Sequence, residues 1–203
     1  LLHDATVAGE TRFTLAHSGN NVATLAAGGT GSAGRVGSID FQGGNGFEVG
    51  SVEGIAGIRA TGGVVLFSSG SYQETVFVNE TIDSLDGSVH LTGYGVTIND
   101  LVSAPSGDIT VAIGSGNFYQ SEGGIAAIHA DLVHGGSLSF LGGSATGDTV
   151  TYSDYSASPV VFDFASLGGI ENLIGTPFAS DQFNGPALAG NYQFTGGDMF
   201  EVN

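Results

Sequence analysis

The chain has 203 residues, of which 41% are hydrophobic, and it contains 36 glycines but only 4 prolines. This hydrophobic content excludes intrinsic disorder, and glycine without a Gly-X-Y period excludes collagen. Its 20 acidic residues outnumber 3 basic ones, and the net charge of −17 argues against a nucleic-acid partner. It has no cysteine for disulfides or thiolate metal sites, and no apolar run long enough for insertion into a membrane. Because the chain does not begin with Met, we expect it to be a piece of a longer protein.

A short alternating pattern recurs along the first two thirds of the chain. Its second and fourth residues are apolar each time, whereas the first and third are mostly polar, which predicts strands with one face in a core. In the third copy this alignment points Val65 and Phe67 inward. The six copies span residues 12–15, 38–41, 64–67, 88–91, 108–111 and 137–140.

Two further apolar stretches follow each copy before the pattern returns. The second stretch is Ile55 with Ile58, then 76–78, 96–98, and Ile125 with Ile128; the third is Ile82, 101–102 and 132–133. Glycine, Asn and Asp at the corners supply the turns. Short strands returning every 20–29 residues predict an all-β fold, a parallel β-helix (β-solenoid). The alternative is an antiparallel sandwich, which does not require the same alternation to return at such an interval.

The spacing of the predicted strands shortens after residue 142. Strands are expected at 149–152, 160–164, 170–174, 182–183 and 192–194. The helix-like run 157–167 contains Pro159 and the β-branched Val160 and Val161, which favour a strand. We therefore divide the chain into β-solenoid coils over 1–142 and continuing coils with shorter turns over 143–203.

The stretches GSVHLTGYGVTINDLVSAPSGDITVAIGSG (87–116) and GGIAAIHADLVHGGSLSFLGG (123–143) resemble the coil repeats of filamentous-haemagglutinin-like bacterial surface proteins. The segment 147–185, with Tyr152-Ser153 before an apolar strand and IENLIG at 170–175, is similar to segments of very large secreted bacterial adhesins. The resemblance implies a right-handed parallel β-helix in an exported protein, secreted or on the cell surface, that often acts as an adhesin.

Calcium is the one cofactor that the resemblance raises. In calcium-binding relatives the IENLIG segment is followed by a Gly-Gly-x-Gly-x-Asp repeat, whose carbonyls and Asp side chain surround the ion. Here the matching stretch 175–181 keeps only Gly175 and Asp181 and contains Pro177. Asp181 is therefore either a calcium ligand or part of a plain coil corner.

Three residues in one short segment have the chemistry of a transition-metal site. His129, Asp131 and His134 would bind zinc or copper if a turn brought them together. The alternative is that each is an exposed residue at a coil corner.

An enzymatic role finds little support in the sequence. A glycosidase needs two facing carboxylates, and a lyase needs a cationic clamp that three arginines and no lysine scarcely provide. We therefore expect a non-catalytic, extracellular structural or adhesive shaft, or alternatively a filament subunit that stacks end to end through open sheet edges. The expected partners are copies of itself or a glycan or protein receptor at a cell surface. Phe47, Phe118 and Tyr119, in glycine-rich loops, would stack on sugars, unless they belong to the core.

Overall fold

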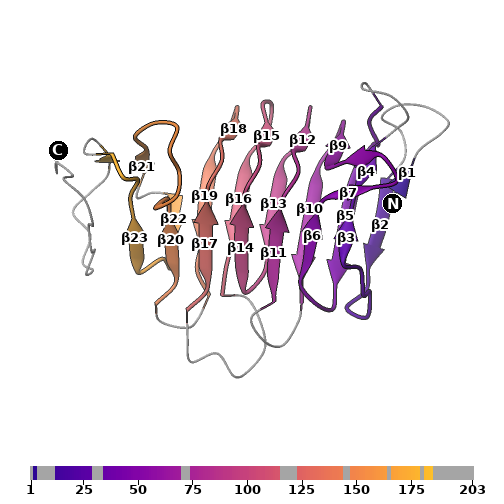
Figure 1. Cartoon of the computed structure of the whole chain (residues 1–203), viewed down its shortest axis with the longest axis horizontal. Helices are drawn as coiled ribbons and strands as arrows, with labels where there is room; N and C mark the ends of the chain where they lie inside the picture. The colour runs from indigo at the N-terminus through magenta and orange to yellow at the C-terminus, as the bar shows by residue number, and fades with distance from the viewer. Residues whose placement is uncertain are drawn as a thin grey trace.

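The computed structural model describes residues 2–3, 12–28, 34–69, 74–114, 123–143, 147–163, 166–178 and 181–184. Within these residues the fold is all-β and is built from three parallel sheets of seven, seven and six strands, which the chain visits in turn (Figure 1). This confirms the predicted parallel β-solenoid and excludes the antiparallel sandwich. The right-handed winding stays a prediction. No helix in the described part of the chain is long and apolar enough to span a membrane.

Sheet 1 contains the recurring alternating segments. Its strands pair in register along the rod, so that Val64, Val89 and Ile109 form one continuous row. In spatial order they are β2 (Arg12–Ala16), β5 (Ser38–Gly43), β10 (Val64–Ser68), β13 (Val89–Thr92), β16 (Ile109–Ala112), β19 (Leu138–Leu141) and β22 (Leu167–Gly168).

Sheet 2 follows sheet 1 in each coil. Its strands are β3 (Thr24–Leu25), β6 (Phe47–Val49), β11 (Thr75–Val78), β14 (Gly95–Ile98), β17 (Ile125–Ile128), β20 (Thr149–Thr151) and β23 (Asn172–Ile174). Sheet 3 completes the coil. Its strands are β1 (Leu2–His3), β4 (Ala27–Gly28), β9 (Ile58–Ala60), β12 (Ile82–Ser84), β15 (Val102–Ala104) and β18 (Leu132–His134).

Two small pairs lie outside these sheets. Strands β7 (Ser51–Val52) and β8 (Ile55–Ala56) form an antiparallel pair, and β21 (Val161–Asp163) pairs in parallel with β24 (Gln182–Asn184). Sheet 3 has no strand after β18 in the described residues, whereas sheets 1 and 2 continue past residue 142 through β22, β20 and β23. The strand expected at 192–194 lies outside the described residues. The division at residue 142 stays a prediction.

The core is a single column of inward side chains from all three sheets. In most strands the inward positions are those predicted, but the prediction for the third copy is wrong by one residue. Val64 and Leu66 are fully buried, whereas Val65 is 38% exposed. All four residues 64–67 are apolar, so alternation alone did not fix which face turns inward.

The prediction for the second apolar stretch of the preceding coil, which begins with the copy at 38–41, was also wrong. Ile55 lies in the β7–β8 hairpin and Ile58 in sheet 3, so neither belongs to sheet 2. The strand that extends sheet 2 at this level is β6, through Phe47 and Val49. It is only three residues long and is flanked by glycine, which hid it among loop residues.

Candidate functional site

His129 belongs to a line of polar side chains that follows the rod axis. Because an amide oxygen only accepts, His129 Nδ1 donates to Asn99 Oδ1 at 2.8 Å, and Asn99 Nδ2 donates to Asn79 Oδ1 at 2.8 Å. Asn79 Nδ2 then donates to Glu48 Oε2 at 2.9 Å. We call these residues, with Thr24 at one end and Asp154 at the other, the polar ladder.

The structure does not bring the three predicted metal ligands together. His129 belongs to the polar ladder, and its Nε2 lies 3.6 Å from Asp154. Asp131 accepts a 2.5 Å hydrogen bond from the Tyr155 hydroxyl. His134 Nδ1 lies 2.8 Å from the carbonyl oxygen of Gly136, two residues further along the chain. The described residues contain no group of three or more His, Asp or Glu side chains arranged to hold a metal ion.

Asp181 is buried, with 1% of its surface exposed. Its carboxylate accepts hydrogen bonds from the backbone N–H of Thr176 at 2.6 Å and of Val160 at 2.9 Å. It also accepts one from the Thr176 hydroxyl at 2.7 Å. These bonds close the turn and tie it to the neighbouring strand, which is a structural role for a coil-corner carboxylate. Calcium binding at Asp181 stays a prediction.

Asp148 forms a second turn of the same kind, which sequence reasoning missed. It is fully buried and accepts hydrogen bonds from the backbone N–H groups of Gly143 and Gly124, at 2.6 and 2.5 Å. Burial raises the pKa of this carboxyl, although the two N–H groups oppose the shift and Glu171 adds to it. A signal was present in the sequence, since in both turns the Asp follows its N–H donor, Gly143 or Thr176, by five residues.

The aromatic residues predicted to bind sugars are only partly described. Phe47 is buried, with 3% of its surface exposed, and its ring meets that of Phe41 edge to face at 4.9 Å. The structure therefore assigns Phe47 to the core, which was the alternative reading. Phe118 and Tyr119 lie outside the described residues.

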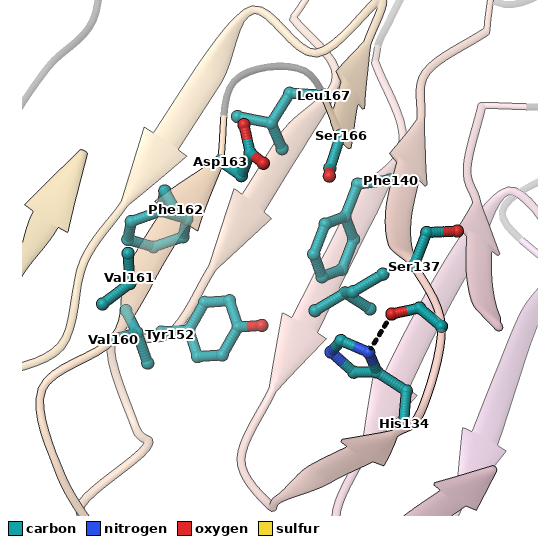
Figure 2. A pocket seen from close by; sticks show the side chains of 12 residues that line it. His134, Ser137, Phe140, Tyr152, Val160, Val161, Phe162, Asp163, Ser166 and Leu167 are labelled. Atoms are coloured by element: carbon teal, nitrogen blue, oxygen red, sulfur yellow. Dashed lines mark hydrogen bonds between the residues drawn. The ribbon is translucent and has the colours of Figure 1, made fainter. Parts of the chain in front are cut away.

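A cavity of about 290 Å³ lies where sheet 3 ends (Figure 2). It is bounded by β18 and β19 on one side and by β21 and β22 on the other, because the chain leaves sheet 3 after β18 and forms β21 instead. Its lining is mostly apolar, with a few polar groups. The apolar lining residues are Leu138, Phe140, Val160, Val161, Phe162 and Leu167; those with a polar group on the side chain are His134, Ser137, Tyr152, Asp163 and Ser166.

Tyr152 is the most deeply buried polar side chain of this lining. Its exposed fraction is 7%, and burial raises the pKa of its phenol well above the ordinary value, with a smaller effect from Tyr155. No described residue hydrogen-bonds to its hydroxyl. Figure 2 shows Tyr152 and His134 extending toward each other from opposite sides of the cavity. Sequence reasoning singled out His134 as a metal ligand and did not foresee this cavity.

The stacked sheets define the class of protein, a parallel β-solenoid. Comparisons with protein-family models, with curated proteins and with solved structures found no match to this chain.

Proposed function

We propose that this chain is a non-catalytic shaft segment of an extracellular bacterial protein, secreted or carried on the cell surface, with adhesive contacts on its outer faces. The observation that supports the proposal is the unbroken register of the sheets. Val64, Val89 and Ile109 stack in one fully buried row, so each coil covers the core of the next. In the described residues, successive strands of each sheet are hydrogen-bonded to each other through their backbones, which makes a stack of coils stiff along its axis.

The surface chemistry is consistent with this role. The net charge of −17 favours solubility and keeps neighbouring shafts apart. Several acidic side chains serve the fold itself: Asp83 pairs with Arg35, and Asp108 accepts hydrogen bonds from the backbone and hydroxyl of Ser137. These carboxylates are thereby committed to holding coils together.

A filament subunit that stacks end to end is the second candidate. In the described residues β2 pairs on one side only, with β5. Leu15, which pairs with the inward Phe41, is nevertheless 39% exposed. An apolar position at an open sheet edge is a surface on which another copy could stack.

Solution scattering and electron microscopy of the purified chain separate the two candidates. A shaft segment gives discrete elongated monomers whose mass is independent of concentration, with or without millimolar Ca²⁺. Fibres would favour the filament subunit, and fibres formed only with Ca²⁺ would add a metal role. Cleavage of any member of a polysaccharide panel would contradict the non-catalytic assignment, and failure of antibodies to label intact source cells or their secretions would contradict the extracellular location.

A further inference from the structure

We propose that the cavity at the end of sheet 3 binds one ring of a neutral saccharide. This inference deepens the proposed adhesive shaft by giving it a ligand, and it rests on that function for its biological meaning. The chemical case rests on the cavity itself.

The first argument is the Tyr152 hydroxyl. A buried hydroxyl without a partner costs free energy, and buried polar groups are normally hydrogen-bonded. Tyr152 is more than nine-tenths buried, lines the cavity, and has no hydrogen-bond partner for its hydroxyl among the described residues. A ligand oxygen in the cavity would satisfy this group.

The second argument is the nature of the other polar groups. Because a carbonyl oxygen only accepts, His134 Nδ1 donates to Gly136, which leaves Nε2 of the neutral ring as an acceptor. Asp163 adds carboxylate oxygens and Ser166 a hydroxyl to the same lining. The lining has no Lys or Arg, so it suits a ligand that carries several O–H donors, and it disfavours an anion.

The third argument is the apolar wall. The ring of Tyr152 meets Phe140 edge to face at 6.4 Å and Phe162 edge to face at 5.4 Å. Flat aromatic surfaces beside hydrogen-bonding groups match a sugar ring, which has C–H groups on its faces and hydroxyls around its edge. The volume of about 290 Å³ lies at the lower end of the range of small-molecule pockets, which matches a ligand of one ring.

The test measures binding of methyl glycosides of neutral hexoses and N-acetylhexosamines by ligand-observed NMR. Proton–nitrogen correlation spectra of the chain then map the contact. We expect millimolar binding of at least one glycoside, with shifts concentrated at residues 134–140, 160–163 and 166–167. The Tyr152→Phe variant removes only the hydroxyl and should weaken binding about fivefold or more. The matched control is Tyr155→Phe, which loses a hydroxyl bonded to Asp131 outside the cavity lining and should keep the wild-type affinity.

The opposite results would overturn the site. These are no binding by any glycoside at millimolar concentration, shifts elsewhere on the rod, or equal affinity in Tyr152→Phe. Preference for an amine or a carboxylate over the neutral sugars would overturn the ligand class. If Tyr152→Phe does not fold, Ser166→Ala supplies the same comparison, because Ser166 lines the cavity and is only partly buried. Solution scattering tests the elongated monomer independently of sugar binding. A failure of the saccharide site can therefore be distinguished from a failure of the proposed shaft function.

Discussion

At the scale of single residues, Asp148 and Asp181 show how one buried carboxylate can stabilise a corner of a coil by accepting hydrogen bonds from the backbone. Each carboxylate accepts a hydrogen bond from the N–H five residues earlier and another from a neighbouring coil. The same side chain therefore closes its own turn and fixes the turn against the stack. Charge-assisted hydrogen bonds are stronger than neutral ones, and the N–H groups of the buried Gly124 and Thr176 have no water to replace the acceptor.

Removing the Asp148 carboxylate should therefore be costly. We expect Asp148→Ala to lower the free energy of unfolding by about 2–3 kcal/mol, because the N–H groups of the buried Gly124 and the partly buried Gly143 lose their acceptor. Urea unfolding followed by circular dichroism measures this change. The control is Asp86→Ala at an exposed carboxylate, which should change stability by no more than about 0.5 kcal/mol. Equal effects of the two substitutions would contradict the role of Asp148.

The pH dependence of the Asp148 contribution has a definite sign. Burial raises the pKa of Asp148, so the folded chain holds this proton to higher pH than the unfolded chain. Between the two pKa values the folded state binds more protons, and stability falls as pH rises. The stability difference between wild type and Asp148→Ala should thus be largest below the unfolded pKa of about 3.9 and shrink as pH rises through the folded value. Urea titrations from acidic to neutral pH test this, and a difference that grows with pH would refute it.

At the scale of the strand and its corner, glycines ahead of sheet 1 set how closely coils approach. A Cβ at Gly107 would overlap the carbonyl of Gly87 on the neighbouring coil. A Cβ at Gly63 would meet only the Ser88 carbonyl oxygen, at an ordinary 3.5 Å. The two glycines therefore occupy equivalent corners, but the backbone of the neighbouring coil approaches Gly107 more closely than Gly63.

Alanine substitution should separate them. We expect Gly107→Ala to destabilise by about 1–3 kcal/mol, since backbone must move to admit the methyl group. Gly63→Ala should be neutral or stabilise by up to about 1 kcal/mol, because alanine restricts the unfolded chain. Thermal and urea unfolding of both variants measure the contrast. Equal destabilisation would mean that the corners do not stack as described.

The polar ladder should couple residues on successive coils. Asn79 and Asn99 share a 2.8 Å side-chain hydrogen bond, so the effects of Asn79→Ala and Asn99→Ala should not add. We expect a coupling of about 0.5–1 kcal/mol in a double-mutant cycle, modest because both side chains are exposed. The cycle of Asn99→Ala with Asp86→Ala, which share no hydrogen bond, should be additive. Coupling of equal size in both cycles would exclude a specific ladder contact.

The elements also show what a sequence can reveal about this fold. Where polar and apolar residues alternate, as in Ser88-Val89-His90-Leu91, the inward face was predicted correctly. Where all four positions are apolar, as at 64–67, the face was decided by pairing with Ile39 and Val89, which no local pattern contains. The cavity escaped prediction for the same reason, since the ring of Tyr152 meets those of Phe140 and Phe162 only through the path of the chain after β18.

At the scale of the whole molecule, each coil contacts mainly its neighbours, so stability is distributed along the stack. One coil can be recognised as an exchangeable unit. Residues 88–107 contain β13, β14 and β15, which is one strand from each sheet. Removing these residues joins Gly87 to Asp108, so Gly87 takes the place that Gly107 has before Asp108 in the native chain.

Deleting residues 88–107 should therefore leave a folded rod. Strands β10, β11 and β12 would then pair with β16, β17 and β18, whose inward residues already share their register through the missing coil. We expect a β-type circular dichroism spectrum, an axial length shorter by about 4.8 Å in solution scattering, and a urea m-value lower by about a tenth. Deleting only 88–98 removes one strand from each of sheets 1 and 2 but none from sheet 3, so the ladders cannot all close and the variant should unfold or aggregate. If the shorter deletion is tolerated and the full-coil deletion is not, the coils are not the unit from which this molecule is built.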